Sequence, residues 1–161
     1  MVSGSNVKRI VQKKIEASLF ASKIKCYWYL AKTNDQKTIQ DIEKKVRQSK
    51  SELVVGIGGG RSVDIAKMIG FDIGKPFVSV PTSASHDGIA SPFVSIKGEK
   101  PHSIVATAPL GVFVDVDIIK KAPKNYLQVV VVILWQKLLQ YEIGSLVGIK
   151  LVNIMEDILL N

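Results

Sequence analysis

The segment Glu52–Ser91 constrains the fold of this chain more than any other part of the sequence. An apolar run at Leu53–Ile57, typical of a buried β-strand, leads into the three consecutive glycines Gly58–Gly60. A helix is predicted directly afterwards, over Arg61–Ile69. A second short strand is predicted over Phe77–Val80, before a proline and a polar loop. This order predicts a strand, a glycine turn, a helix and a parallel strand.

The glycine turn predicts an anion-binding site at the start of the helix. Unpaired backbone N–H groups and the helix dipole point at one spot there. Glycine suits the position because a Cβ would keep a phosphate away from the backbone, and because the turn is expected to require a positive φ. The turn matches neither a Walker A loop nor a GxGxxG motif. The pattern therefore indicates a nucleotide phosphate, the alternative being a tight connection without a ligand.

Alternating helices and strands predict a parallel sheet covered on both faces. Helices are expected at Val7–Ser22 and at Asp35–Ser49, with a strand over Lys25–Ala31 between them. The second helix should be capped from Thr33–Asp35 and should bury Ile39, Ile42 and Val46. Right-handed crossovers would put the glycine turn at the carboxyl edge of the sheet, where open α/β folds bind ligands.

The pattern changes beyond the polar loop. Short strands are expected at Phe93–Ile96, Ser103–Thr107 and Val112–Val116, with turns between them, and this spacing favours a β-hairpin or an edge addition. A helical turn is expected at Asp117–Lys121.

Composition limits the class of protein. A chain of 161 residues with 47% hydrophobic residues has room for one globular core. The single cysteine, Cys26, excludes an intrachain disulfide and is expected to be a buried structural thiol, which fits a cytoplasmic protein. The N-terminus lacks the apolar core of a secretion signal. The longest apolar run, Val129–Trp135, is far shorter than the roughly 20 residues of a membrane span.

The net charge of +8 raises nucleic-acid binding as a rival class. The lysines are spread over many segments and are not interleaved with stacking aromatic residues, so we expect a solvated basic surface and no nucleic-acid partner.

Polar residues crowd the loop after the second strand: Thr82, Ser83, Ser85, His86 and Asp87. His86 could act as an acid, a base or a metal ligand, or could be structural. Asp87 could accept hydrogen bonds from substrate hydroxyls or could stabilise the loop. The second histidine, His102, is assigned no role, and neither histidine has the spacing of a zinc site.

The first helical turn after the glycines is less distinctive. Ser62 and Asp64 are ordinary residue types for that position, and packing or capping is the expected role of Asp64. Lys67, one turn further on, is expected at the surface.

The motifs GIGGGRSVDIAK, FVSVPTSASHDGIAS and APLGVFVDVDIIKKAPKNYL resemble the archaeal sn-glycerol-1-phosphate dehydrogenase family. That family lies in the group of iron-containing alcohol dehydrogenases, glycerol dehydrogenase and 3-dehydroquinate synthase. The glycine motif is shared across the group, whereas the Ser85–Gly88 loop followed by Ser91 is more particular to the glycerol-1-phosphate enzymes. The match covers about residues 33–127. It implies an α/β fold with a Rossmann-like parallel sheet and NAD(P)H-dependent reduction of dihydroxyacetone phosphate for ether-lipid synthesis.

The resemblance also implies the roles of individual residues. The segment matching Gly60–Asp64 would cradle the dinucleotide pyrophosphate, and Asp87 would contact the substrate. The full set implied for NAD or NADP is Gly58, Gly59, Gly60, Arg61, Ser62, Val63, Asp64, Thr82, Ser83, Ala84, Ser85 and Ser91. In the family a zinc ion polarises the substrate carbonyl, held by an aspartate and two histidines of a helical C-terminal domain. No catalytic residue or metal ligand is assigned within this chain.

The tail Gln128–Asn161 departs from the family, which continues with Ser-Gly-x-Gly-Asp and then Thr-Ala-Val-x-Asp-Trp. Every valine codon begins with GT, so reading the valine-rich Gln128–Ile133 one frame over permits a Ser-Gly-x-Gly-Asp run, and Gln140–Gly144 permits Val-Arg-Asp-Trp. We therefore expect residues 1–127 to be an incomplete NAD(P)-binding domain and 128–161 a frameshifted tail. The polypeptide alone should be inactive. The alternatives are a glycerol dehydrogenase-type enzyme and a non-catalytic nucleotide-binding module. Family members are often homo-oligomers.

Overall fold

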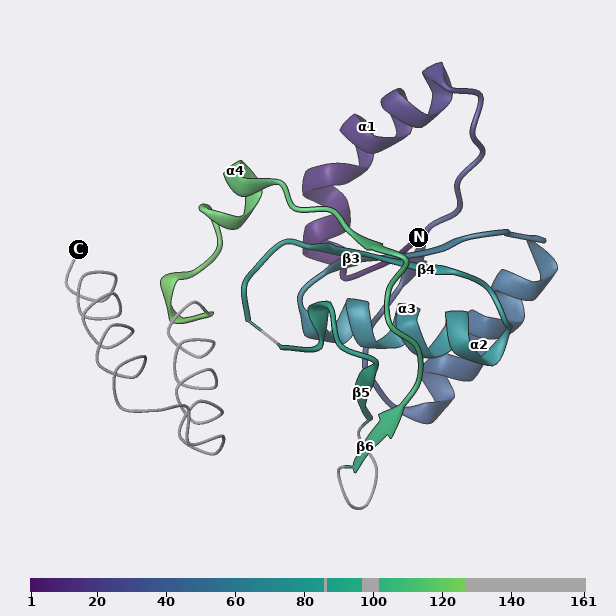
Figure 1. Ribbon diagram of the computed structural model, residues 1–161. Helices are drawn as coiled ribbons and strands as arrows, with labels where there is room; N and C mark the ends of the chain where they lie inside the picture. Colours follow the sequence, from purple (N-terminus) through teal and green to yellow (C-terminus); the bar gives the residue numbers. More distant parts are fainter. Residues whose placement is uncertain (86, 97–101, 127–161) are drawn as a thin grey trace, which may run out of the picture.

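The computed structural model describes residues 1–85, 87–96 and 102–126 (Figure 1). Its centre is a five-stranded sheet in the order β2-β1-β3-β4-β7, in which every neighbouring pair is parallel. The strands are β1 (Val2–Ser3), β2 (Tyr29–Leu30), β3 (Val54–Gly58), β4 (Phe77–Pro81) and β7 (Gly111–Val112). The predicted α/β fold with a Rossmann-like parallel sheet is confirmed.

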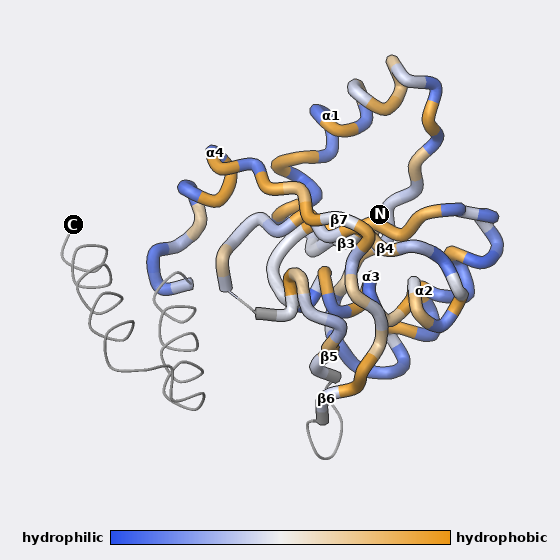
Figure 2. The backbone as a smooth tube through the Cα atoms, in the orientation of Figure 1, coloured by the Kyte–Doolittle hydropathy of each residue, from blue (hydrophilic) through white to orange (hydrophobic). Residues whose placement is uncertain are grey.

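Helices cover both faces of this sheet. Helix α1 (Ser5–Ala21) lies on one face, and α2 (Gln36–Gln48) and α3 (Gly60–Asp72) lie together on the other (Figure 1). Colouring by hydropathy shows polar residues on the outer side of α2 (Figure 2). The helical spacing of the apolar residues gives α2 one side to bury, whereas α3 is buried on several sides, including the six consecutive residues 62–67.

Helix α2 begins where its sequence predicts. The side chain of Asp35 accepts a hydrogen bond from the backbone N–H of Thr38 at 2.8 Å, which caps the first turn. Ile39, Ile42 and Val46 are buried, as their spacing of three and four residues requires. These predictions are confirmed.

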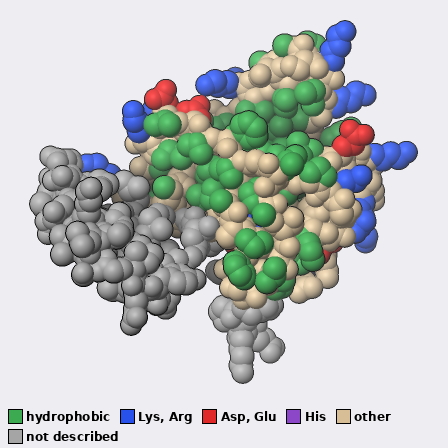
Figure 3. Space-filling model, in the orientation of Figure 1, with side chains coloured by type: hydrophobic (Ala, Val, Ile, Leu, Met, Phe, Trp, Pro, Cys, Tyr) green, Lys and Arg blue, Asp and Glu red, His purple; other side chains and the backbone are tan. Residues whose placement is uncertain are grey.

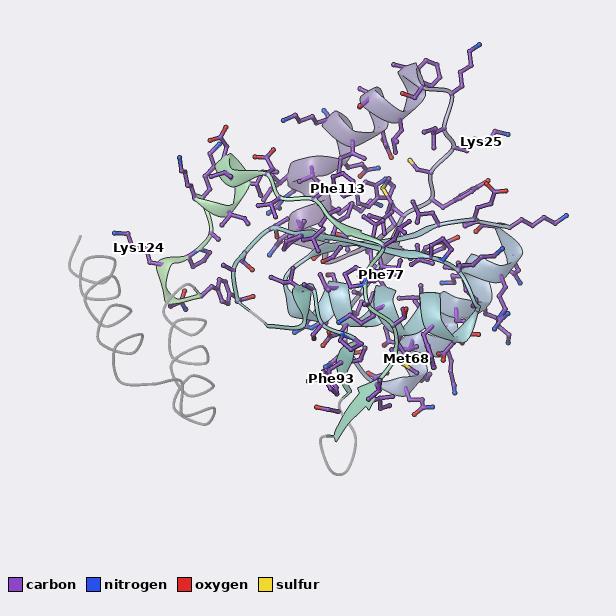
Figure 4. All side chains as sticks on the ribbon, viewed as in Figure 1. Lys25, Met68, Phe77, Phe93, Phe113 and Lys124 are labelled. Atoms are coloured by element: carbon purple, nitrogen blue, oxygen red, sulfur yellow. The ribbon has the colours of Figure 1, made fainter. Side chains whose placement is uncertain are left out.

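The core lies between α3 and the strands β3 and β4. Val63, Ile65 and Ile69 of α3 are fully buried there. Phe77 of β4 packs on the same side of the sheet, close to Gly70 of α3, where a side chain would collide with it (Figure 4). Helix α3 and strand β3 therefore form one tightly packed unit on either side of the glycine turn.

The short strands after β4 divide between two sheets. β5 (Phe93–Ile96) and β6 (His102–Val105) form the antiparallel hairpin that the sequence predicts. The third predicted strand begins at β7, which pairs in parallel with β4 and completes the edge of the main sheet. It is much shorter than Val112–Val116, because α4 (Val116–Ile119) begins four residues after β7 ends, capped by Asp115.

Two expectations near the N-terminus are wrong. The strand predicted over Lys25–Ala31 is limited to Tyr29–Leu30, because its only sheet neighbour, β1, has two residues to pair with. Cys26, expected to be buried, is half-exposed in the segment that precedes β2, and it lines an open apolar groove beside the end of α1.

Apolar side chains lie exposed between the residue before β7 and the first residue of α4. They belong to Leu110, Phe113, Val114 and Val116. The space-filling view shows hydrophobic side chains gathered on this side of the molecule (Figure 3). None of the helices within the described residues is long and apolar enough to cross a membrane. The predicted tail 128–161 lies outside the described residues.

Candidate functional site

The strand order reverses between β1 and β3. From β1 the chain moves to β2 on one side and then returns to β3 on the other, so the direction of strand addition reverses at this pair. Open parallel sheets bind ligands outside the carboxyl ends of the strands at such a reversal. Gly4 follows β1 there, the glycine turn follows β3, and Thr82 follows β4.

The glycine turn has the backbone geometry that the sequence predicts. Gly58 has φ +143°, a conformation that L side chains rarely adopt. Gly59 caps α3 without any side-chain hydrogen bond. Within the described part of the chain, the N–H groups of Gly60 and Arg61 donate to no backbone carbonyl outside the helix. The start of α3 therefore offers free amide donors to an anion.

The polar loop after β4 faces this turn. The N–H of Thr82 donates to the carbonyl of Gly58 at 3.0 Å, which joins the ends of the two strands. A Cβ added at Gly59 would lie 3.4 Å from Ser83 Oγ and 3.7 Å from Ser85 Oγ, and these two hydroxyls lie 3.0 Å apart. The structure thus brings Gly58, Gly59, Thr82, Ser83 and Ser85 together, although more than twenty residues separate the two segments.

Ser62 lies close to Gly58 and Gly4, at the ends of β3 and β1. Its side chain is 5% exposed, and its Oγ is 2.9 Å from a Cβ added at Gly58 and 4.0 Å from one added at Gly4. The sequence reasoning missed Gly4. No local signal could have found it, because β1 has two residues and is identified as a strand by its pairing with β2 and β3.

The other predicted cofactor residues are placed by different contacts or by burial. The Arg61 guanidinium donates to the carbonyl of Lys32 at 2.9 Å, just past the end of β2. The Val63 side chain is fully buried in the core. Ala84 and Ser91 are half-buried in the loop region. For these residues a cofactor contact stays a prediction.

Asp64 and Lys67 point into the protein. Lys67 is fully buried, so its expected surface position is wrong. Its Nζ lies 3.8 Å from Asp64 Oδ1 and donates to the carbonyls of Gly88 at 2.6 Å and Phe93 at 2.8 Å. Asp64 also accepts the N–H of Ser95 at 3.2 Å. These contacts agree with the packing role expected for Asp64.

The remaining polar candidates are only partly placed. Asp87 is the first residue of the short 3₁₀ helix η1 (Asp87–Ile89), which directly precedes β5 in the fold. The predictions for the His86 side chain lie outside the described residues, and His102 begins β6. No group of three His, Cys, Asp or Glu side chains among the described residues could hold a metal ion.

The arrangement can bind a phosphorylated ligand. Backbone amides, the positive end of α3 and the hydroxyls of Ser83 and Ser85 meet where a Cβ would take up the space next to Gly59. A dinucleotide pyrophosphate fits this donor set, because it needs several hydrogen-bond donors and a close approach to the backbone.

Comparison with known proteins shows the family to which the chain belongs. Residues 1–123 match the model of the iron-containing alcohol dehydrogenase family. Over 127 residues, the chain is 58% identical to a glycerol-1-phosphate dehydrogenase [NAD(P)+] of Nitrosopumilus maritimus. It is 60% identical over the same length to the enzyme of that name from Cenarchaeum symbiosum. Both alignments cover 79% of this chain and 36% of the relative, so the chain spans about a third of the length of these relatives.

A solved structure shows the same fold. The crystal structure of glycerol dehydrogenase from Schizosaccharomyces pombe superposes with a TM-score of 0.75 at 23% identity, covering 83% of this chain and 36% of that one. The resemblance inferred from the motifs is confirmed, but it begins at residue 1 and not near residue 33 as predicted. The chain belongs to the iron-containing alcohol dehydrogenase family.

Proposed function

We propose that this chain is the cofactor-binding part of an NAD(P)-dependent glycerol-1-phosphate dehydrogenase, which reduces dihydroxyacetone phosphate to sn-glycerol 1-phosphate. The observation that carries the proposal is the meeting of the glycine turn and the Ser83–Ser85 hydroxyls at the strand reversal. The name of the relatives at 58% and 60% identity supplies the reaction and the cofactor class.

The pyrophosphate would lie against Gly59, with the free amides of Gly60 and Arg61 as donors. Gly58, Ser62, Thr82–Ser85 and Ser91 would complete the cofactor contacts, and Asp87 would hold a substrate hydroxyl. The bound dinucleotide supplies the hydride. The residues of this chain would bind the dinucleotide and orient it for hydride transfer.

The resemblance also implies zinc. The described residues offer no group of three ligating side chains, so no step is assigned to a metal on them. Because the chain spans 36% of its relatives, we propose that residues 1–127 bind the cofactor without turning over substrate. A cytoplasmic location is part of the same proposal.

The first test is titration of the 161-residue chain with NADPH, followed by the fluorescence of the reduced nicotinamide. We expect saturable binding that NADP⁺ reverses. The absence of binding by a folded sample would remove the proposed function.

The second test measures turnover in a chimera that joins residues 1–127 to the C-terminal two-thirds of the Nitrosopumilus maritimus relative. We expect oxidation of NADPH with dihydroxyacetone phosphate and not with dihydroxyacetone. A preference for the unphosphorylated substrate would support the glycerol dehydrogenase alternative. The Schizosaccharomyces pombe glycerol dehydrogenase has the same fold. Binding without any turnover would support a non-catalytic nucleotide-binding module.

A further inference from the structure

The buried ammonium of Lys67 is the least expected feature near the site. A lysine without exposed surface gives up the hydration of its charge, which costs several kcal/mol in general unless polar partners replace the water. Here the partners are two backbone carbonyls, those of Gly88 in η1 and Phe93 in β5, at 2.6 and 2.8 Å. Both carbonyls belong to the segment that follows the polar loop.

Asp64 also links α3 to the segment after the polar loop. One of its carboxylate oxygens lies 3.8 Å from Lys67 Nζ, and the other accepts the N–H of Ser95 in β5 at 3.2 Å. Asp64 and Lys67 stand three residues apart, so they share one side of α3. Together they connect the helix that starts at the glycine turn with η1 and with the first strand of the hairpin.

The loop between β4 and β5 is therefore held at both of its ends. At its start, Thr82 is bonded to Gly58 of the turn. At its far end, Gly88 and Phe93 are bonded to Lys67, two turns along the helix from the same glycines. The loop residues proposed for the cofactor and the substrate lie between these two attachments, at Ser83–Ser85 and at Asp87.

We propose that Lys67 is a positioning residue, which fixes the loop 82–91 relative to the glycine turn and so sets the geometry of the cofactor and substrate contacts. The inference rests on the proposed function. The competing view is that the Asp64–Lys67 pair only stabilises the core. The two views differ in their consequences: a core role changes global stability, whereas a positioning role changes the loop and the affinity for the cofactor in a protein that stays folded.

The test replaces the ammonium with an uncharged side chain of similar length, Lys67→Met, in the 161-residue chain. NADPH affinity and hydrogen exchange are measured together. Ile69→Ala is the matched control, because Ile69 is fully buried on the same helix and belongs to the apolar core. Truncation of this apolar side chain is expected to lower stability to an extent comparable with Lys67→Met.

For Lys67→Met we expect the Kd for NADPH to rise about tenfold, the size of one lost hydrogen bond to a charged group. The amides of residues 82–95 should lose exchange protection while β3 and β4 keep theirs. Ile69→Ala should leave the Kd of the folded fraction unchanged. Wild-type affinity and wild-type loop protection in Lys67→Met would overturn the inference, and so would an equal rise in Kd in Ile69→Ala.

A milder variant and a wild-type measurement cover the case in which Lys67→Met does not fold. Asp64→Asn keeps an acceptor for Ser95 and removes the charge beside Lys67, so it should raise the Kd in the same direction by less. In the wild-type chain, NADPH should increase the protection of residues 87–95, and no change there would contradict the coupling. If the wild type does not bind NADPH while Lys67→Met still frees the loop, the proposed function fails and the anchoring role remains.

Discussion

Gly59 and Ser83 face each other across the carboxyl edge of the sheet, with 3.4 Å between Ser83 Oγ and the position that a Cβ on Gly59 would occupy. Gly59 has φ −79°, which any residue can adopt, so its backbone conformation does not require glycine. What the missing side chain provides is room between the start of α3 and the hydroxyls of Ser83 and Ser85. The requirement for glycine at this position therefore concerns a ligand more than the fold.

Gly59→Ala should separate these two requirements. An added methyl would be in ordinary contact with Ser83 and Ser85, so the loss of stability should stay at about 1 kcal/mol or less, as for a weakened helix cap. The same methyl would keep a phosphate off the backbone, and the Kd for NADPH should rise about tenfold or more. Thermal unfolding and NADPH titration of the same sample check both parts. Unchanged affinity would show that the pyrophosphate does not lie at Gly59.

Gly56→Ala should instead lower the stability of the fold. A Cβ there would lie 2.8 Å from the Cβ of Ala66 and 3.0 Å from the Cα of Val63, closer than packed atoms approach. Strand β3 and helix α3 would have to separate, which costs about 1–3 kcal/mol in overpacked cores. Urea unfolding should show this loss. Gly4→Ala is the control, because its Cβ would meet nothing nearer than 4.0 Å, and an equal loss there would contradict the packing argument.

The fold near the site could be predicted from the sequence because its signals are local. β3 and β4 are apolar runs that end in glycine or proline, and Asp35 caps the helix that its position predicts. Such features depend on residues that are neighbours in the chain, where hydrophobic period and turn chemistry are informative.

The rest could not be predicted because it depends on partners far away in the sequence. β1 has two residues, too few for any periodicity, and only its neighbours β2 and β3 identify it as a strand. Lys67 carries a charge that sequence reasoning assigns to solvent. Its burial becomes favourable because polar partners replace the water, among them the carbonyls of Gly88 and Phe93, 21 and 26 residues away.

Asp35 should make the stability of α2 depend on pH. The hydroxyl of Thr33 and the backbone N–H of Thr38 hydrogen-bond to its carboxylate and lower its pKa below the ordinary value of 3.8. Its stabilising effect is therefore complete above that value and is lost as the pH falls through the lowered pKa. Asp35→Asn keeps a capping oxygen without a titrating group. The melting temperature of the wild type should exceed that of Asp35→Asn at pH 6 and should lose this advantage in strong acid. A constant difference across that range would contradict the assignment.

The N-terminal ammonium should also make stability increase with pH, but at higher pH, in a polypeptide whose first residue is Met1. It donates to the carbonyl of Tyr27 at 2.6 Å, and burial lowers its pKa from 8.0 to about 6, against an opposing contribution from Cys26. Between those values the unfolded chain holds a proton that the folded chain has released, so the free energy of unfolding should increase as the pH rises from 6 to 8. For a shift of this size, the free energy of unfolding should increase by about 2 kcal/mol between pH 6 and pH 8.

Urea unfolding at several pH values between 5.5 and 8.5 measures this increase. The matched control is the same chain acetylated at Met1, which keeps an N–H donor for Tyr27 and has no charge to titrate. Its stability should be flat across the interval in which the free amine changes. Equal slopes for the two forms would mean that the ammonium of Met1 stays hydrated in the folded protein. The start of β1 would then be more open to solvent than its pairing with β2 and β3 implies.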